Sequence, residues 1–364
     1  MDIKAAITHK KGEISIETVQ LADPRENEVM VKLVACGVCH TDTAAIEQFI
    51  PVTLPAVMGH EGVGIVEKVG PGVTSLAPGD HVIMTFPSCG ECPKCLEGHP
   101  YACEIRNDLF FNGVLKDGTK RLSQDGVEVS SFFSQAGFAT YAVLNDRNAV
   151  KVDPTVDLRP LCSLGCGVQT GAGAVLNRLK PEAGSTIAIF GCGGVGMAAI
   201  MGAAIVGCGK IIAVDVVPSR LEMAKELGAT DVVNGKTENT VERIREITGG
   251  GANYSVECSG IPALTLQAID CLGTEGTACV VSVTGDASIN IQMEAMLMNP
   301  SRTLCGLTEG GSNPQVFIPE LVKYFSEGRL PVDKLVKFYP FEDIKQAFED
   351  SHSGKVIKPI LLFD

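Results

Sequence analysis

Residues 187–199, IAIFGCGGVGMAA, constrain the fold of this chain more than any other segment. Gly191, Gly193 and Gly196 form the pattern G-x-G-x-x-G between a strand-like apolar run and a helical run. The first glycine permits a tight turn, the second lets the backbone approach a pyrophosphate, and the third lets the helix pack on the strand. Free N–H groups at the helix start favour phosphates. The pattern predicts a dinucleotide site rather than a turn without a ligand, with contacts at Gly191, Gly193, Gly194, Val195 and Gly196.

Strand-like and helical segments alternate on both sides of this turn. STIAIFG precedes the helical GVGMAAIMGAAIVG, KIIAVDV precedes PSRLEMAKELG, and the alternation continues to RTLCGL. Such alternation predicts right-handed βαβ units and an open, doubly wound parallel sheet.

The first part of the chain has a different pattern. Short β-branched runs such as EVMVKLVAC and GVGIVEKVG are separated by turns. The tail, which ends in the strand-like VIKPILLF, no longer alternates and is expected to return to this first part. We therefore expect an α/β protein in which a β-rich domain, residues 1–167 and 309–364, is interrupted by a parallel-sheet domain, residues 168–308.

Asp215 ends the strand-like KIIAVDV, 19 residues after Gly196. A carboxylate there accepts hydrogen bonds from the adenosine ribose and repels a 2′-phosphate, which favours NAD over NADP. An ordinary carboxylate at the end of a strand is the alternative. Arg220 lies nearby in the sequence and could instead accommodate a phosphate.

Charge and hydropathy exclude several classes of partner. The net charge of −13, with no basic block, argues against nucleic acid and anionic membranes. No apolar run approaches the ~20 residues that span a bilayer. The N-terminus, MDIKAAITHKKGEISIE, is too charged for a signal peptide. We therefore expect a cytoplasmic protein whose 14 cysteines are not paired in disulfides.

Four of these cysteines are closely spaced in SCGECPKCLEGHPYAC. Cys89, Cys92, Cys95 and Cys103 have the spacing C-x2-C-x2-C-x7-C. Four thiolates close a tetrahedron around zinc and leave no position for a substrate, which predicts a structural zinc site. The first three spacings also suit an iron–sulfur cluster, but the long last gap and the lack of a following proline disfavour it. His99 lies inside the loop and is surplus to four thiolates.

A second set of metal ligands is dispersed along the chain. The segment CGVCH, residues 36–40, matches the attachment motif of a c-type haem, but a haem carrier would need export. Cys39, His60 and Cys166 each lie in a glycine-marked turn. Two thiolates and one imidazole leave the fourth position of a zinc ion open, as catalysis requires. Sequence spacing alone does not bring these three residues together.

Taken in order, these motifs resemble the zinc-containing medium-chain alcohol dehydrogenases. The similarity is carried, over essentially the whole length, by CGVCHTD, GHEGVGIVEKVG, PGDHV, the four-cysteine loop, LGCGVQTGAGA, GCGGVG with the later aspartate, and VIKPILLF. The resemblance implies a GroES-like catalytic domain interrupted by a Rossmann domain. It also implies two zinc ions per chain and NAD as cofactor. The catalytic ligand set Cys39, His60 and Cys166 is the established one of this family, so it is carried over rather than derived.

The resemblance also implies roles for residues around these motifs. Thr41 corresponds to the hydroxyl that accepts the substrate proton, Asp42 to the carboxylate that orients the histidine ligand, and Glu61 to the acidic residue behind the metal. The residues that correspond to cofactor contacts outside the glycine turn are His40, Thr170, Arg220 and Lys358.

The implied reaction is the reversible oxidation of a primary alcohol to its aldehyde. Zinc lowers the pKa of the bound alcohol so that an alkoxide forms, and hydride passes to the nicotinamide ring. One residue departs from the family pattern: Ala44 stands where many members have the histidine that ends the proton relay. The proton must therefore leave by another route, such as water or the cofactor ribose.

The substrate is expected to be large and flat. By alignment the pocket is lined by Ile50, Phe86, Phe132 and Phe133, in a chain with only 14 phenylalanines, 5 tyrosines and no tryptophan. An aromatic or allylic alcohol would gain ~25 cal/mol per Å² of apolar surface buried there. The nearest branch is thus the aryl-alcohol dehydrogenases, with benzyl alcohol as the type of substrate, although some of these phenylalanines could be ordinary core residues.

Two other functions remain as alternatives. Glutathione-dependent formaldehyde dehydrogenases need polar groups at the pocket mouth, and Ile50 is apolar where they have an acidic residue. A non-catalytic, zinc-stabilised binding protein would not need the full set of Cys39, Thr41, His60, Glu61 and Cys166. The family favours homo-oligomers, and a homodimer or homotetramer is expected.

Overall fold

The computed structural model describes residues 1–363, and the chain divides into two compact units. The first unit contains residues 1–166, 313–328 and those from 332 onward, and the second contains residues 167–312 and 329–331. The second unit therefore interrupts the first, and the α/β fold class expected from the sequence is confirmed.

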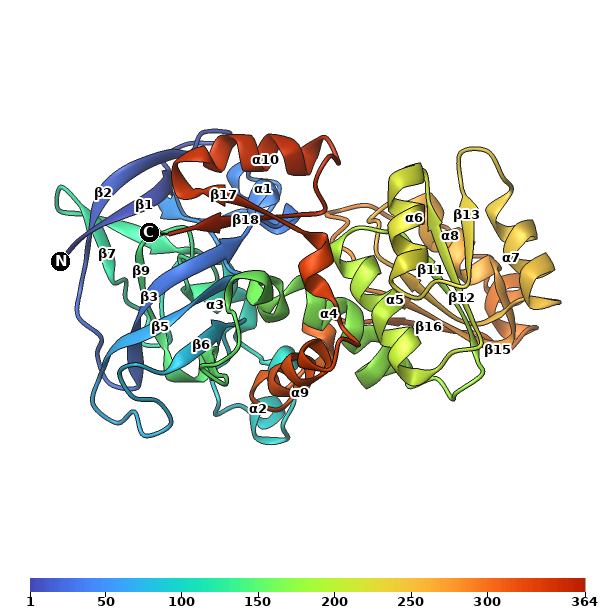
Figure 1. Cartoon of the computed structure of the whole chain (residues 1–364), viewed down its shortest axis with the longest axis horizontal. Coiled ribbons are helices and arrows are strands. Elements are labelled where there is room, and N and C mark those ends of the chain that lie inside the picture. Colours follow the sequence, from blue (N-terminus) through green and yellow to red (C-terminus); the bar gives the residue numbers. More distant parts are fainter. Residues whose placement is uncertain (364) are drawn as a thin grey trace. The chain divides into compact units, whose positions relative to one another are not determined.

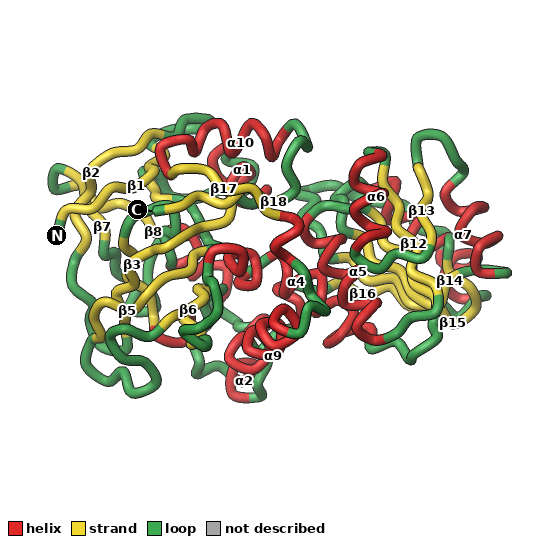
Figure 2. Tube along the Cα trace, in the orientation of Figure 1, coloured by secondary structure: helices red, strands yellow, loops and turns green. Residues whose placement is uncertain are grey.

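The first unit is built from a small closed barrel and a seven-stranded sheet (Figures 1 and 2). The barrel contains β1 (Asp2–Thr8), β2 (Ser15–Leu21), β7 (Leu122–Gln124), β8 (Val127–Ser131) and β4 (Ala56–Val57). The sheet runs in the order β10 (Ala149–Lys151), β6 (His81–Met84), β5 (Gly62–Val69), β3 (Glu28–Gly37), β18 (Lys358–Leu362) and β17 (Val336–Pro340), while β9 (Tyr141–Asn145) also pairs with β3. The helices of this unit are α1 (His40–Ile46), α2 (Pro93–Leu96), α3 (Arg106–Phe111), α9 (Pro314–Ser326) and α10 (Ile344–His352).

Strand β3 organises the first unit. Its apolar sequence EVMVKLVACG is buried along most of its length, because it pairs with three other strands. Strand β18 pairs antiparallel with its end, with Ile360 opposite Gly37 and Leu361 opposite Cys36. The C-terminal strand thus lies beside the segment that leads to the first candidate metal ligand, and the predicted return of the tail to the first part of the chain is confirmed.

The second unit is a six-stranded parallel sheet whose successive strands are mostly connected by helices (Figure 1). The strand order is β13 (Asp231–Asn234), β12 (Lys210–Asp215), β11 (Thr186–Phe190), β14 (Ala252–Glu257), β15 (Leu272–Val280) and β16 (Thr303–Gly306). The helices are α4 (Gly167–Gly173), α5 (Gly194–Val206), α6 (Pro218–Glu226), α7 (Thr240–Thr248) and α8 (Pro262–Asp270). In chain order this is the doubly wound arrangement 3-2-1-4-5-6, which binds dinucleotides at the carboxyl ends of the strands where the order reverses.

The apolar segments of this chain form strands and short helices rather than membrane spans. Over residues 1–363, no helix has both the length and the apolar character needed to cross a bilayer.

A buried ion pair fastens the start of β3 to the residue before β7. Nε of Arg121 donates to Oε2 of Glu28 at 2.9 Å, and the two residues are 2% and 4% exposed. Replacing Glu28 by Gln would leave a buried guanidinium without its main counter-charge, a change that costs about 3–5 kcal/mol in such sites. Asp117 still contacts Arg121, at 2.6 Å, so we expect Glu28→Gln to lower the free energy of unfolding by about 3 kcal/mol, the lower end of this range.

Denaturant unfolding of the whole enzyme, compared between wild type and Glu28→Gln, measures this loss. The control is Glu26→Gln, two residues earlier on the exposed approach to the strand, where we expect less than ~0.5 kcal/mol. Equal stabilities of the two variants would contradict the structural role assigned to Glu28.

Candidate functional site

One buried carboxylate links two of the three loops that carry the predicted catalytic ligands. Asp42 lies in α1, and its Oδ2 accepts the backbone N–H of Cys39 at 3.1 Å. Its Oδ1 accepts the N–H of Gly59 and lies 3.0 Å from Nδ1 of His60. Because Asp42 is fully buried, these contacts are shielded from water and fix the orientation of the imidazole ring.

The fold brings the dispersed ligands together. Ligand atoms of Cys39, His60, Glu61 and Cys166 lie within 4.8 Å of one another. Among the described residues, Nε2 of His60 is buried without a hydrogen-bond partner, while the opposite ring nitrogen faces Asp42. A buried nitrogen in this state costs free energy unless it binds something. Two thiolates and an imidazole are ligands that zinc prefers, so these residues fit a zinc ion.

The charges in this cluster favour a cation. A hydrogen bond from Cys166 and the charge of His60 hold the pKa of Cys39 well below its usual value, against the effect of burial. Burial alone would lower the pKa of His60, but the negative charges of Asp42 and Cys39 raise it well above its usual value. The lowered pKa of Cys39 favours a thiolate, and the raised pKa of His60 shows that its surroundings favour a positive charge. Both are expected of a site that binds a metal cation.

Glu61 and Lys358 form a second buried pair beside these ligands. Nζ of Lys358 lies 2.8 and 3.0 Å from the two carboxylate oxygens of Glu61, and it also donates to the carbonyl of Val38. Burial raises the pKa of Glu61, although Lys358 opposes this effect. The phosphate contact expected of Lys358 stays a prediction, and the structure adds a protein partner for it that the sequence did not indicate.

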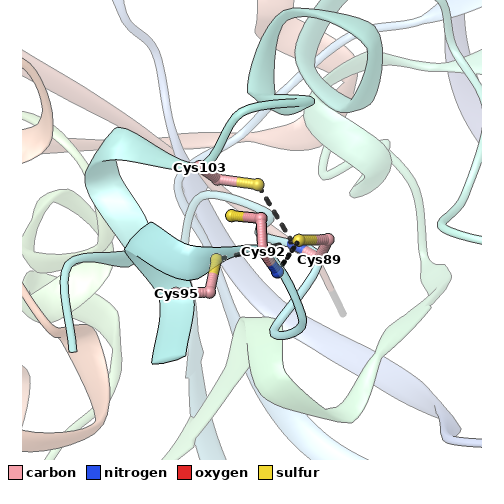
Figure 3. Close-up of side chains that lie close together, drawn as sticks. All are labelled: Cys89, Cys92, Cys95 and Cys103. Atoms are coloured by element: carbon pink, nitrogen blue, oxygen red, sulfur yellow. Dashed lines mark hydrogen bonds between the residues drawn. The ribbon is translucent and has the colours of Figure 1, made fainter. Parts of the chain in front are cut away.

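The four-cysteine loop forms a separate cluster (Figure 3). The sulfur atoms of Cys89, Cys92, Cys95 and Cys103 lie within 4.8 Å of one another, around the short helix α2. Backbone N–H groups point at the sulfurs: that of Cys89 donates to Cys103 and that of Cys92 to Cys89, both at 3.3 Å. Hydrogen bonds from the backbone of Glu104 and Cys95 lower the pKa of Cys92 to about 6, whereas burial raises the pKa of Cys95 to about 12 and raises that of Cys103. The four sulfur atoms nevertheless converge as the ligands of a closed zinc site do.

Two residues that the sequence motifs contain, His99 and Cys36, lie outside both sets of candidate ligands. His99 is about half exposed and lies 3.8 Å from Glu97, outside the set of four thiolates. Cys36 is fully buried in the core. The CGVCH pattern therefore does not present two accessible thiols.

Thr41 and His40 begin helix α1. The hydroxyl oxygen of Thr41 lies 3.6 Å from Sγ of Cys39, so it stands next to the candidate metal ligands. His40 is exposed at the first residue of the helix. Ala44 follows in the same helix, and its carbonyl accepts the backbone N–H groups of Phe49 and Ile50.

Aromatic side chains surround the imidazole of His60. The ring of Phe133 lies 4.6 Å from it and that of Phe132 lies 5.6 Å away, edge-on. Phe110 stacks on Phe133 at 4.3 Å. The backbone of Phe133 has φ 54°, a left-handed conformation that is strained for an aromatic residue.

The other two predicted pocket residues also lie in the first unit. Phe86 is buried in the same apolar cluster as Phe132 and Phe133, and it lines a cavity with Ser88 and Pro100. Ile50 is half buried in the segment after α1. The structure therefore places two of the four predicted residues directly against His60.

The glycine turn of the second unit has the geometry that the sequence predicts. Gly191 has φ +90°, and Gly193 is the N-cap of α5. A Cβ at Gly196 would overlap the carbonyl oxygen of Gly191, whereas a Cβ at Gly193 would meet nothing within 4 Å. Gly196 is thus required for packing, and Gly193 leaves open space next to the helix N-terminus, as a cradle for phosphates requires.

Asp215 closes the same turn from the next strand. Its carboxylate accepts the N–H of Cys192 at 2.7 Å and the N–H groups of Val216 and Val217 at 2.7 and 2.9 Å. Arg220 lies 3.9 Å away, and its Nε is buried without a hydrogen-bond partner in the described residues. Thr170, in α4, is 8% exposed. These residues fit a dinucleotide, and the buried Arg220 nitrogen leaves a hydrogen-bond donor beside Asp215.

Comparison with known proteins agrees with this geometry. Residues 25–154 match the family model described as alcohol dehydrogenase GroES-like domain, and residues 194–326 match that of zinc-binding dehydrogenase. The chain therefore belongs to the zinc-containing medium-chain alcohol dehydrogenase family, and it is an enzyme of that class.

Particular relatives are similar over the whole chain. Geraniol dehydrogenase of Castellaniella defragrans is 40% identical over 99% of this chain and 97% of its own. The benzyl alcohol dehydrogenase structure from Acinetobacter calcoaceticus has 43% identity and a TM-score of 0.96, with both chains fully covered. An alcohol dehydrogenase zinc-binding domain protein from Burkholderia ambifaria has 47% identity and a TM-score of 0.98, covering 100% of this chain and 99% of its own.

Sequence reasoning missed two features of this site. Phe110 and Phe111, which pack on Phe133, come from helix α3, whose segment EIRNDLFFN carries no motif. The one feature of this segment that could have indicated a buried aromatic contact is the pair of adjacent phenylalanines in an otherwise polar stretch. The Glu61–Lys358 pair joins residues 297 positions apart, and nothing in the sequence connects them.

We expect two zinc ions per chain, one at each cluster. Cys166→Ser should reduce the metal content to one zinc and abolish turnover while the fold persists, because a neutral hydroxyl replaces a thiolate ligand. Cys103→Ser should also leave one zinc, but it should lower the thermal stability, because the four-cysteine site is closed and structural.

Elemental analysis, activity and circular dichroism on both variants separate these outcomes. The matched control is Cys208→Ser, which removes a buried thiol outside both clusters and should leave the zinc content unchanged. Iron or haem absorbance, or full turnover by the Cys166 variant, would contradict the assignment.

Proposed function

We propose that this enzyme oxidises primary aromatic or allylic alcohols reversibly to aldehydes, with NAD as the cofactor. The observation that carries the proposal is the cluster of Cys39, His60 and Cys166, with the Thr41 hydroxyl beside it and phenylalanine rings against the imidazole. When bound, zinc supplies a Lewis acid that lowers the pKa of an alcohol, and nicotinamide supplies the hydride acceptor.

The residues of this chain then have distinct roles. Cys39, His60 and Cys166 hold the metal, and Asp42 keeps the imidazole in the tautomer whose Nε2 can bind it. Thr41 accepts the hydroxyl proton of the substrate in a hydrogen bond. Glu61 places a negative charge behind the ligands, and Lys358 neutralises it. Because Ala44 replaces a histidine, the proton leaves through water or the cofactor ribose.

We assign the catalytic zinc to Cys39, His60 and Cys166 and the structural zinc to the four-cysteine loop. We assign NAD binding to the glycine turn with Asp215, and the substrate pocket to Ile50 and the phenylalanines Phe86, Phe132 and Phe133. The catalytic domain then consists of residues 1–167 and 309–364, and residues 168–308 bind the cofactor. We further propose that the enzyme works as a homodimer or homotetramer in the cytoplasm, on a small-molecule substrate and without nucleic acid or membrane partners.

The substrate class follows from the aromatic groups at the metal cluster. Phe132 and Phe133 pack against His60, so the wall beside the metal cluster is aromatic. A flat ring or an allylic double bond that meets the edge of such a ring gains about 0.5–1.5 kcal/mol beyond area burial. Ethanol has no group that makes these contacts. The named activities of the geraniol and benzyl alcohol dehydrogenases support this proposal.

A kinetic panel with NAD tests the substrate class. We expect kcat/KM for benzyl alcohol and geraniol to exceed that for ethanol by more than ~100-fold, from the extra apolar area buried. A preference for formaldehyde with glutathione would instead identify the enzyme as an S-(hydroxymethyl)glutathione dehydrogenase. A preference for ethanol would refute the aromatic pocket.

Phe133→Leu is the matching variant. Loss of one aromatic edge contact should lower kcat/KM for benzyl alcohol about 3- to 10-fold and leave the value for ethanol nearly unchanged. Phe348→Leu serves as the control, because that ring packs on Phe138 rather than on His60. Equal losses for both alcohols would mean that Phe133 is only a core residue.

NAD specificity is carried by Asp215. Its carboxylate stands at the end of β12, where it is fixed by three backbone N–H groups. Replacing it by Ser removes the negative charge that repels a 2′-phosphate, and it frees Arg220 to bind one. We expect the ratio of kcat/KM for NADP to that for NAD to rise at least ~10-fold.

Asp231→Ser is the control, since that residue begins the neighbouring strand β13 and lies away from the glycine turn. An unchanged cofactor ratio in the Asp215 variant would refute the selective role. Isothermal titration with both cofactors would show whether the change lies in binding.

A further inference from the structure

The hydrogen bonds of Asp42 do not reach the third candidate zinc ligand. Within residues 1–363 its carboxylate contacts the loops of Cys39 and His60 only. Cys166 comes from a distant segment, directly after the 3-10 helix Arg159–Gly165. A metal ligand must be held within ~0.5 Å of its productive geometry, so a different contact is needed to position Cys166.

Thr85 supplies a contact to the loop that carries Cys166. It directly follows β6, and its Oγ1 donates a hydrogen bond to the carbonyl oxygen of Gly165 at 3.0 Å. Thr85 is 0% exposed and Gly165 is buried, so water does not compete for this hydrogen bond. A Cβ at Gly165 would overlap the carbonyl oxygen of Met84, which shows how closely the end of β6 approaches this loop.

This hydrogen bond acts on the peptide unit that joins Gly165 to Cys166. Because a peptide unit is planar, holding the oxygen of Gly165 also holds the nitrogen and the Cα of Cys166. The same nitrogen donates to the carbonyl oxygen of Ser163 at 3.2 Å. The peptide unit is therefore held on both sides, and it carries the side chain whose Sγ lies in the metal cluster.

Thr85 is itself held by two further hydrogen bonds. Its backbone N–H donates to the carbonyl oxygen of Asn148 at 2.8 Å, and its own carbonyl oxygen accepts Nε2 of Gln135 at 2.7 Å. Gln135 and Asn148 are both buried. Gln135 lies two residues after Phe133, so the turn that carries the aromatic wall and the loop that carries the third ligand are joined through Thr85.

We propose that Thr85 is a positioning residue for the catalytic zinc, and that its hydroxyl holds the loop of Cys166 in place relative to Cys39 and His60. The inference rests on the assignment of Cys166 as a zinc ligand in the proposed function. Groups that orient metal ligands typically contribute about 10–100-fold to metal affinity or activity. Asp42 and Thr85 together then position all three ligands.

The rate of zinc release tests this role. The zinc-loaded enzyme is mixed with excess 4-(2-pyridylazo)resorcinol, and the absorbance of the zinc complex is followed with time. Release from two sites should give two phases, and the phase that Cys166→Ser lacks belongs to the catalytic site. In Thr85→Val, which keeps the shape of the side chain without its donor, we expect this phase to be about 10-fold faster.

Two more variants separate the hydrogen bond from the shape of the side chain. Thr85→Ser keeps the hydroxyl and should release zinc at close to the wild-type rate. Thr85→Ala lacks both the hydroxyl and the methyl group, and its catalytic phase should be at least as fast as that of Thr85→Val.

Cobalt(II) substitution gives a readout that fold stability alone would not change. The charge-transfer absorption of cobalt(II) arises from its thiolate ligands, and the part that disappears in Cys166→Ser reports on that ligand. We expect Thr85→Val to weaken or shift this part of the spectrum and Thr85→Ser to restore it.

Thr8→Val is the matched control. Thr8 is also 0% exposed, and its Oγ1 has no hydrogen-bond partner in the described part of the chain, so the same substitution removes no contact there. Its zinc release and cobalt spectrum should match those of the wild-type enzyme.

Several results would overturn the proposal. A catalytic phase no faster in Thr85→Val than in Thr8→Val would show that the hydroxyl does not hold the ligand loop. Equal acceleration of both phases would mean that Thr85 only stabilises the first unit, and equal acceleration in Thr85→Ser would assign the effect to packing. Retention of two zinc ions by Cys166→Ser would instead refute the ligand assignment on which the inference rests.

Discussion

The carboxylate of Asp42 is the contact on which the candidate metal centre depends. It is fully buried, yet each of its oxygens has hydrogen-bond partners: the N–H groups of Cys39 and Gly59 and the ring of His60. A buried carboxylate is costly unless it is paired in this way, so the two loops that it joins are held in one arrangement. The same contacts fix the ring nitrogen that faces the thiolates. One side chain therefore sets both the positions and the protonation of the candidate ligands.

The β3 strand and the C-terminal strand supply the frame around this carboxylate. Strand β3 leads directly into Cys39, and β18 pairs with its end and brings Lys358 to Glu61. The charges beside the ligands thus come from segments nearly 300 positions apart. In this chain the last strand therefore completes the electrostatic environment of the first ligand loop.

The proposed cofactor site depends on the topology of the parallel sheet. It lies where the strand order reverses, between β11 and β14, and relies on a helix N-terminus and on open space above Gly193.

The sequence by itself determined the elements and their order. The alternation of strand and helix predicted the parallel sheet, because apolar periodicity and turn residues act locally. The strands and α-helices from residue 185 to residue 306 were expected, but the π-helix Met293–Met298 was not. It also identified the four-cysteine loop, whose ligands lie within 15 residues of each other and need only a local turn to meet. The glycine turn was equally local.

Only the tertiary structure decided which distant residues meet. Cys39, His60 and Cys166 were named through a family resemblance, since their spacing carries no information about contact, and the fold brings their ligand atoms within 4.8 Å. Phe110 and Lys358 could not be placed from sequence, because α3 and β18 reach the site through packing and strand pairing rather than through any motif.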